Sequence, residues 1–413
     1  MESQSIIDSA EGRRILIYSH DSFGLGHLRR CRAIAHALVE ENKHLSVLIL
    51  SGSPIIGSFD FRARVDFVRI PGVIKLRNGE YTTLSLHINI EQTLAMRASI
   101  IRHTAEFFDP DIFIVDKEPL GLRGEVKETL VMLKRRGTRI VLGLRDVLDE
   151  PRLLGPEWRR KNVLPALRQL YDDIWIYGLP QICDPLADIG LPADVLHKVT
   201  FTGYLPRKVP VSPPPSVALE AVEDPFVLVT AGGGGDGAEM MDWVLRAYEC
   251  APPPPWNALL VFGPFMSPEM QAQLRERVQK LPRVSAIVFD VYLETLMARA
   301  AGVVAMGGYN TFCEILSFDK RAVIVPRRVP RMEQYIRASR ARELGLCAML
   351  DDDGRRDTSA MATALRRLPQ QRLPSEVVVP GLLDGFVNLN RLVAMRLADG
   401  RRAGGVARVG GSR

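Results

Sequence analysis

Short apolar runs alternate with longer stretches of helical periodicity along the whole chain. In the first half these runs lie at 14–19, 45–50, 65–70, 111–116, 138–144, 173–177 and 199–203. In the second half they lie at 226–231, 257–263, 284–289, 302–306 and 321–326. The stretch after the first run is typical of an amphipathic helix, because Leu28, Cys31, Ala35 and Leu38 recur at helical spacing. Unbroken apolar strands separated by such helices predict an α/β fold, with parallel sheets covered by helices on both faces.

The length of the chain predicts two domains. Its 413 residues exceed one ordinary hydrophobic core and fit two domains of roughly 200 residues each. The proline-rich segment 206–215 is unsuited to a helix or an inner strand, so it indicates a stiff linker. We expect a flexible N-terminus at 1–12, a first Rossmann-like domain at 13–205, a Pro-rich linker at 206–222, a second Rossmann-like domain at 223–384, a terminal helix at 385–398 and a disordered Gly/Arg tail at 399–413.

Composition narrows the class of protein. The 46% hydrophobic and 25% charged residues are typical of a soluble globular protein. No run is long enough for a membrane span, and the polar start lacks a signal-peptide pattern. The five cysteines are scattered, which predicts reduced thiols in a cytoplasmic protein.

The net charge of +6 gives little support for a nucleic-acid partner. Four arginines against one aspartate place +3 of that charge in the tail 399–413, and no stripe of Lys and Arg interleaved with aromatic residues is present elsewhere. We therefore expect no nucleic-acid partner, whereas an anionic small ligand or an acidic membrane surface is compatible with the charge.

Three glycine-rich turns follow predicted strands and precede predicted helices. Glycine lets the backbone approach a phosphate closely, and a helix N-terminus adds free N–H groups and a positive dipole end. The turns are Gly24-Leu25-Gly26-His27, Gly232-Gly233-Gly234-Gly235-Asp236-Gly237 and Gly307-Gly308-Tyr309-Asn310-Thr311. Such turns in both halves predict two nucleotide-binding-type domains that face one cleft. The alternative interpretation of 232–237 is a flexible hinge at the entry to a domain.

His27 is the candidate general base. Its position at the start of a helix places the imidazole at the carboxyl edge of the sheet, where ligands bind in open α/β folds. A helix N-terminus disfavours the imidazolium, so we expect His27 to be neutral and able to accept a proton near pH 7. The alternative is a histidine that only caps the turn.

Two acidic positions in the second half have competing interpretations. Thr311 and Glu314 have the spacing of a capping box, in which Glu314 reaches back to its own helix N-terminus; the alternative is that this carboxylate accepts hydrogen bonds from ribose hydroxyls. Glu333 and Gln334 suit sugar hydroxyls, or they are ordinary first-turn polarity of a helix.

Charged residues also end predicted strands in the first half. Asp116 and Arg145 lie at the ends of such strands and are candidates to face a ligand. The alternative is that these charged residues merely pair with one another. The segment 72–95 has no clear period and predicts a long functional loop.

The motif from Gly307 to Glu314, followed by Glu333-Gln334, resembles the donor-binding motif of family-28, MurG-type glycosyltransferases. The first glycine turn, read as Gly-x-Gly-His-x-x-Arg-Cys up to Cys31, is also similar to the loop of nucleotide-sugar hydrolases of pseudaminic acid synthesis. The resemblance covers most of 13–350 in layout. It implies a GT-B fold, an N-terminal acceptor domain, a C-terminal donor domain, no cofactor and no catalytic metal.

The resemblance also implies roles for single residues. Gly307, Gly308 and Thr311 would hold the donor diphosphate, Glu314 the ribose, and Glu333 and Gln334 the donor sugar. The remaining candidates on the donor side are Gly232, Gly233, Gly234, Asp236, Gly263, Val291 and Asn310, and those of the acceptor-side loop are Gly24, Gly26, Arg30 and Arg145. His27 and Asp116 are the catalytic candidates. Arg337 stands where the MurG pattern has Asn, so the identity of the sugar does not transfer.

These observations predict an inverting, metal-independent glycosyltransferase that uses a nucleotide diphosphate sugar, with UDP as the expected nucleotide. The acceptor is unidentified and could be lipid-linked or a polysaccharide. The rivals are a nucleotide-sugar hydrolase or epimerase with the same site, and a nucleotide-sugar-binding regulatory protein without turnover. Apolar residues near Lys75 and Arg77, and the basic cluster 159–161, suit a peripheral contact with anionic lipid at the inner membrane face. The alternative for that loop is a mobile lid over the donor.

Overall fold

The computed structural model describes residues 12–20, 26–76, 80–209, 220, 222–233 and 235–399. Several predicted features lie outside the described residues: Gly24, Gly234, nearly all of the N-terminal segment, most of the Pro-rich linker, and the tail after Asp399.

The first half folds around one parallel sheet. Within the described residues this sheet has seven strands in the order β3-β2-β1-β6-β7-β8-β9, and each neighbouring pair is parallel. The strands are β1 (Arg13–Ser19), β2 (Leu45–Ser51), β3 (Val65–Arg69), β6 (Ile112–Asp116), β7 (Arg139–Arg145), β8 (Asp173–Tyr177) and β9 (Val199–Phe201). After β1, the chain first adds β2 and β3 on one side of it and then adds β6 to β9 on the other side. The boundary between β1 and β6 is therefore the topological switch point, where α/β sheets bind ligands.

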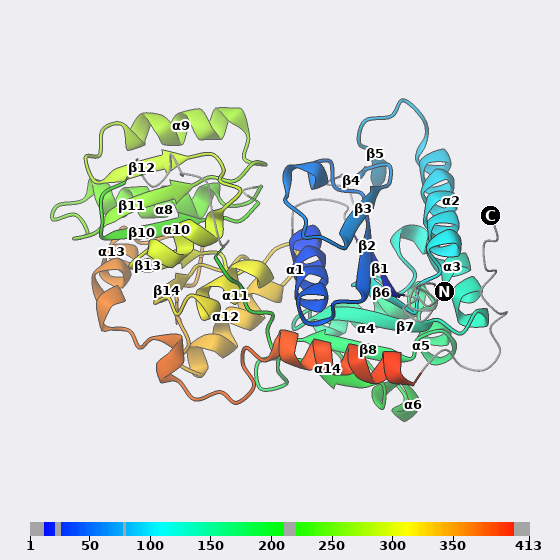
Figure 1. Ribbon diagram of the computed structural model, residues 1–413. Helices are drawn as coiled ribbons and strands as arrows, with labels where there is room; N and C mark the ends of the chain where they lie inside the picture. Colours follow the sequence, from blue (N-terminus) through cyan, green and yellow to red (C-terminus); the bar gives the residue numbers. More distant parts are fainter. Residues whose placement is uncertain are drawn as a thin grey trace, which may run out of the picture.

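Helices cover both faces of this first sheet, as Figure 1 shows on its blue-to-green side. They are α1 (Gly26–Glu41), α2 (Ile90–Phe108), α3 (Lys127–Arg135), α4 (Pro151–Arg160), α5 (Leu164–Gln169) and α6 (Ala193–Leu196), with short 3-10 turns at Ile56–Ser58 and Leu122–Gly124. Alternate side chains of the central strands enter two separate apolar cores, one under α1 and one under α2 and α3. The burial on both faces explains why these strands read as continuous apolar runs.

The second half repeats the architecture with a six-stranded parallel sheet in the order β12-β11-β10-β13-β14-β15. Its strands are β10 (Phe226–Thr230), β11 (Asn257–Val261), β12 (Val284–Ile287), β13 (Gly302–Ala305), β14 (Ala322–Ile324) and β15 (Ala348–Met349). Its helices are α8 (Ala238–Glu249), α9 (Pro268–Val278), α10 (Leu293–Arg299), α11 (Tyr309–Ser317), α12 (Glu333–Glu343) and α13 (Thr358–Arg367), with 3-10 turns at Leu368–Gln370 and Pro374–Glu376. The predicted fold class, two Rossmann-like parallel-sheet domains, is confirmed.

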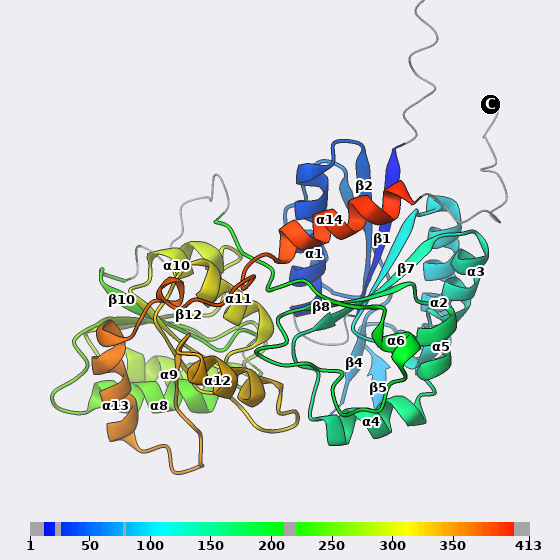
Figure 2. The ribbon, with the colours of Figure 1, turned by 90° about the horizontal axis from the view of Figure 1, so that it is seen from below.

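The last helix, α14 (Gly385–Ala398), lies against the first sheet domain although it follows the second in sequence (Figure 2). Its Asn390 accepts a hydrogen bond from Asn42, the residue after α1, at 3.4 Å, and its Arg396 donates to Asp173 at 2.5 Å. Leu382 lies in the segment that returns from the second domain to α14, and its carbonyl accepts a hydrogen bond from the amide of Tyr204 at 2.8 Å. The chain therefore crosses between the two domains twice at one place.

The expectation that 72–95 has no regular structure is wrong at both ends. Residues Val73–Lys75 (β4) and Tyr81–Thr83 (β5) pair as an antiparallel hairpin, and α2 already begins at Ile90. The signal for that helix start is a capping box: Asn89 accepts from the amide of Gln92 at 2.7 Å, and the Gln92 side chain accepts from the amide of Asn89.

A glycine after β11 fixes the second glycine turn. Gly263 has a φ of +92°, and a Cβ added to it would lie 2.6 Å from the carbonyl carbon of Gly233. The same Cβ would lie 2.7 Å from the carbonyl oxygen of Gly232. The turn at 232–233 therefore packs directly on the backbone of Gly263, which gives this glycine a structural reason to be present.

We expect Gly263→Ala to destabilise the protein by more than about 1 kcal/mol, because the new methyl group meets backbone and the left-handed conformation disfavours alanine. The free energy of unfolding from denaturant titration measures this. Gly57→Ala is the matched control, since a Cβ at Gly57 meets nothing within 4 Å. Equal effects of the two substitutions would contradict the packing argument.

Candidate functional site

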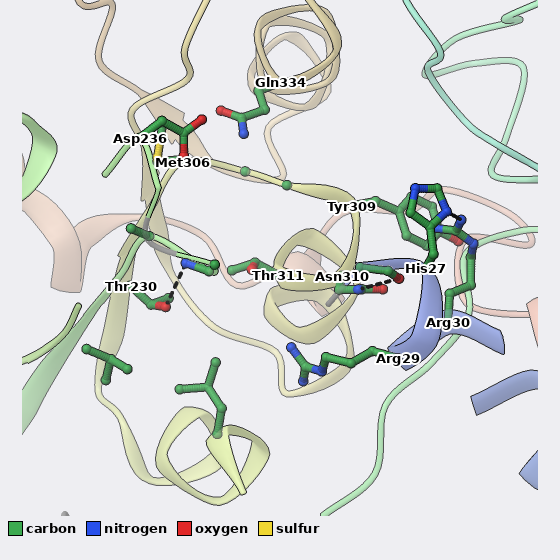
Figure 3. Close-up of a pocket in the computed structure, with 18 of the residues that line it drawn as sticks. His27, Arg29, Arg30, Thr230, Asp236, Met306, Tyr309, Asn310, Thr311 and Gln334 are labelled. Atoms are coloured by element: carbon green, nitrogen blue, oxygen red, sulfur yellow. Dashed lines mark hydrogen bonds between the residues drawn. The ribbon is translucent and has the colours of Figure 1, made fainter. Parts of the chain in front are cut away.

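The candidate site is a cleft between the carboxyl ends of the two sheets, and both domains line it (Figure 3). Most of the predicted site residues come together there: Gly26, His27, Arg30, Arg145, Gly232, Gly233, Asp236, Val291, Gly307, Gly308, Asn310, Thr311, Glu333 and Gln334. Three others do not line the cleft. Gly263 supports the turn at 232–233, whereas Asp116 and Glu314 are buried behind residues that do line it.

His27 is the second residue of α1 and is hydrogen-bonded to a buried carboxylate. Its Nδ1 lies 2.5 Å from Oδ2 of Asp116, the last residue of β6. Arg30, one turn further along α1, donates to the other oxygen of Asp116 at 2.6 Å and 3.0 Å. Because an ionised carboxylate only accepts hydrogen bonds, Nδ1 carries the proton and Nε2 keeps its lone pair. The arrangement therefore orients His27 as a proton acceptor.

Electrostatics keep the two partners in these forms. Burial lowers the pKa of His27 to about 4, and this outweighs the opposing effect of Asp116. Burial raises the pKa of Asp116, but the charge of Arg30 and the contact with His27 outweigh it and hold that pKa well below its usual range. Burial therefore keeps His27 neutral at pH 7, the expected state, whereas the expectation rested on the helix dipole.

A second histidine lies behind the first. His20 directly follows β1, is 4% exposed, and its ring packs edge-on against that of His27 with 5.7 Å between centroids. Burial, with the charge of Lys117, lowers its pKa well below the usual value. The sequence analysis missed His20, although its place at the carboxyl end of the central strand was a usable signal.

On the opposite side of the cleft, α11 points its N-terminus at the site. Gly308 is the N-cap, and no side chain hydrogen-bonds to the first turn. Gly307 has a φ of +76°, and a Cβ there would lie 2.7 Å from Cγ2 of Ile324, so the tight turn requires glycine. An uncapped helix N-terminus of this kind attracts anions. Thr311 lines the cleft in the first turn (Figure 3).

Two predicted donor residues are engaged with the first domain. The side-chain amide of Asn310 donates to the carbonyl of Gly26 at 3.0 Å and accepts from Arg207 at 2.8 Å. Glu314 is fully buried and accepts from Arg29 of α1 at 2.5 Å. The capping-box interpretation of Glu314 is wrong, because the N-cap is Gly308 and Thr311 already lies inside the helix. A role of Glu314 in ribose binding stays a prediction.

Arg327 also lines the cleft and contacts three of the predicted site residues. It was not predicted from the sequence. Its guanidinium donates to Glu333 at 2.9 Å and lies 3.1 Å from the Asp236 carboxylate. Its backbone amide donates to the side chain of Gln334 at 3.1 Å. Burial raises the pKa of Glu333, but Arg145 and Arg327 outweigh it, so the carboxylate is ionised. The second oxygen of Glu333 is buried and has no hydrogen-bond partner among the described residues.

Arg337 joins the donor side to the first domain. It is fully buried in α12 and donates to both oxygens of Asp146, which follows β7, at 2.6 Å each. It also donates to the carbonyl of Gly307 at 2.8 Å, and Tyr204 donates to Asp146 at 2.7 Å. Arg337, which replaces the Asn of the MurG pattern, therefore forms an ion pair between the two domains and also hydrogen-bonds to the glycine turn.

The described residues contain no helix long and apolar enough to cross a membrane. They also contain no group of three or more His, Cys, Asp or Glu side chains arranged to hold a metal ion.

Comparisons with known proteins agree on the fold. No family model matches the sequence, and no curated protein matches it. Among solved structures, the chain is similar to the glycosyltransferase VinC in complex with dTDP, with a TM-score of 0.58 and 17% identity over 93% of this chain and 98% of that one. It is similar to the glycosyltransferase of kitacinnamycin, with a TM-score of 0.57 and 15% identity over 93% and 95% of the two chains.

MurG of Acinetobacter baumannii is a third similar structure, with a TM-score of 0.56 and 11% identity over 94% of this chain and 99% of that one. These alignments span both domains almost completely. The chain therefore has the two-domain GT-B fold of glycosyltransferases, and the predicted resemblance to MurG-type proteins holds at the level of structure.

The buried ion pair makes a prediction about stability. Arg337→Gln should cost about 3–5 kcal/mol, because it leaves the Asp146 charge buried without its cation. The double variant Arg337→Gln/Asp146→Asn should recover part of the loss, since both charges are then gone. The free energy of unfolding by denaturant titration gives both values.

Lys280→Gln is the control, because Lys280 and Glu276 form an exposed surface pair, which contributes little to stability. If Arg337→Gln were no more destabilising than Lys280→Gln, the pair would not be an important interdomain contact.

Proposed function

We propose that this protein is an inverting, metal-independent glycosyltransferase that moves a sugar from a nucleotide diphosphate sugar, with UDP as the favoured nucleotide, to an acceptor hydroxyl. The observation that carries the proposal is the pairing of two groups across one cleft. A neutral histidine oriented by a carboxylate lies on one side, and an uncapped helix N-terminus lies on the other. The likeness to glycosyltransferase structures supports it.

In the proposed reaction, Nε2 of His27 takes the proton of the acceptor hydroxyl while that oxygen attacks C1 of the sugar. The bond from C1 to the diphosphate breaks on the opposite face, which inverts the anomeric centre and releases the nucleoside diphosphate. The N-terminus of α11, with Gly307, Gly308 and Thr311, stabilises the leaving diphosphate. Asp116 stabilises the imidazolium that forms, and Glu333 and Gln334 contact the sugar.

The rival function, a nucleotide-sugar hydrolase or epimerase, would use the same groups with water or no acceptor. Incubation with a panel of UDP- and dTDP-sugars in EDTA, with and without sugar acceptors, distinguishes the two. Release of nucleoside diphosphate only with acceptor supports the transferase. Release without acceptor supports the hydrolase, and binding without turnover supports a sensor. Turnover that disappears in EDTA and returns with Mg²⁺ or Mn²⁺ contradicts the metal-free mechanism.

We expect His27→Ala to lower kcat by about 10²–10⁴-fold while donor affinity changes less than about threefold, because a general base acts in the transition state. Turnover assays and calorimetric titration with the donor measure the two quantities. His36→Ala is the matched control, since His36 lies on the same helix but does not line the cleft. Parallel losses of donor affinity and rate in His27→Ala would mean that His27 is structural.

The acceptor is lipid-linked in this proposal, and the protein acts from the cytoplasm at the inner face of the membrane. The support is a cluster of exposed apolar side chains around the β4–β5 hairpin and α2, where Leu76, Leu86 and Met96 are 43%, 44% and 43% exposed. Such residues beside basic ones suit a peripheral contact with anionic lipid.

We expect the protein to co-sediment with vesicles of anionic phospholipid at low salt and to dissociate at high salt, because the basic contribution is screened. The variant Leu76→Ser/Leu86→Ser should bind less at both salt concentrations, and Val387→Ser, exposed on α14, is the control. If the wild-type protein stays in the supernatant at low salt, the acceptor is better sought among soluble molecules and the hairpin is better explained as a lid.

A further inference from the structure

Lys117 and Arg145, two cations at strand ends of the first domain, form no ion pair within the described residues. Lys117 directly follows β6 and Arg145 ends β7, and these strands are neighbours in the sheet, with Asp116 in register with Gly143. Arg145 lines the cleft, and its Nε is buried without a hydrogen-bond partner. Within the described ranges, neither side chain makes a hydrogen bond or an ion pair.

The other cations of the cleft are all paired. Arg30 is bound to Asp116, Arg337 to Asp146, and Arg29 to Glu314 and Glu294. Arg327 is bound to Glu333, and Arg331 lies 3.5 Å from Asp149. The unpaired state of Lys117 and Arg145 is therefore not a general property of this cleft.

No carboxylate that the structure describes forms an ion pair with either cation, although Glu333 lies near enough to affect the pKa of both. Burial, the largest cause, and the charge of Arg145 lower the pKa of Lys117 to about 8 against the opposing effect of Glu118 and Glu333. Burial also lowers the pKa of Arg145, against the effect of Glu333. Glu118 is held by Lys161 at 2.8 Å and one oxygen of Glu333 by Arg327, so each carboxylate already has a cation of its own. Buried charge without a partner is costly, and such sites mark places where a ligand completes the charge balance.

We propose that Lys117 and Arg145 form a subsite for an anionic group, a carboxylate or a phosphate, that belongs to a substrate and is not the donor diphosphate. The proposal rests on the proposed function, since it places this group next to the proposed base. The group can come from the acceptor or from the transferred sugar. The diphosphate is assigned to the N-terminus of α11, in the other domain, which leaves the first-domain cations free for a second anion.

The position of the subsite gives it a consequence for the chemistry. Lys117 is one of the charges that lower the pKa of His27. An anion bound between Lys117 and Arg145 offsets this effect and makes His27 a stronger base. Substrates with the anionic group would therefore gain in rate as well as in affinity.

The first arm of the test uses a donor pair that differs by one group. UDP-glucose and UDP-glucuronate differ by a hydroxymethyl and a carboxylate at C6 of the sugar, and UDP alone reports the diphosphate. If the anion belongs to the transferred sugar, calorimetry should show UDP-glucuronate binding about tenfold more tightly than UDP-glucose. Lys117→Gln and Arg145→Gln should each remove most of this preference while the affinity for UDP stays within about threefold.

The second arm tests the acceptor as the source of the anion. Glucose, glucuronate and glucose 6-phosphate are titrated into the protein saturated with UDP and, separately, into the protein without nucleotide. Binding of the anionic sugars but not of glucose, lost in both glutamine variants, assigns the subsite to the acceptor. Because the series without nucleotide needs no donor, it tests the subsite even if UDP and dTDP fail to bind, a result that contradicts the proposed function alone.

Two further variants serve as controls. Arg145→Lys keeps the charge and should retain part of the preference, whereas Lys280→Gln removes an exposed charge outside the cleft and should change nothing. Melting temperatures of all variants exclude unfolding as the cause. The proposal is overturned if neither arm shows an anion preference that depends on Lys117 and Arg145. It is also overturned if their substitution weakens UDP as strongly as the anionic probes, because the pair then serves the diphosphate.

Discussion

The buried ion pair between Arg337 and Asp146 is the contact on which the candidate site depends. It joins α12 of the second domain to the end of β7 in the first, and the same guanidinium holds the carbonyl of Gly307. Two charges without solvent contact must stay together, because separating them leaves each without compensation in a medium of low dielectric. The pair therefore fixes the relation between the glycine turn before α11 and the strand ends of the first domain.

Other polar contacts join the two domains across the cleft. Arg29 reaches Glu314 and Glu294, and Asn310 reaches the backbone of Gly26. These polar residues belong to α1 and to α10–α11, so the helices that face the site also hold the two domains together. A ligand that binds between the two domains must either leave these contacts in place or replace them with contacts of its own. Glu314 is the clearest case, because Arg29 holds the carboxylate that the resemblance assigns to ribose.

The cleft separates its charges by domain. On the first-domain side, Asp116 is neutralised by Arg30, while Lys117 and Arg145 form no ion pair with any residue that the structure describes. On the second-domain side, Arg327 is shared between Asp236 and Glu333, and the positive end of α11 adds potential without a side chain. His27 lies at the boundary and is kept neutral by burial. The first-domain side thus favours anions, and on the second-domain side the N-terminus of α11 does so, which agrees with a site for phosphorylated sugars.

The sequence by itself determined the two parallel sheets, the glycine turns at 232–233 and 307–308 and most of the residues that line the cleft. These features depend on local rules: apolar runs of strand length, helical spacing, and glycine where the backbone must turn sharply. Only the tertiary structure decided how Glu314 and Arg337 are used, because their partners Arg29 and Asp146 lie on other elements far away in sequence. The path of α14 back to the first domain was decided in the same way, since an amphipathic pattern does not specify which surface it covers.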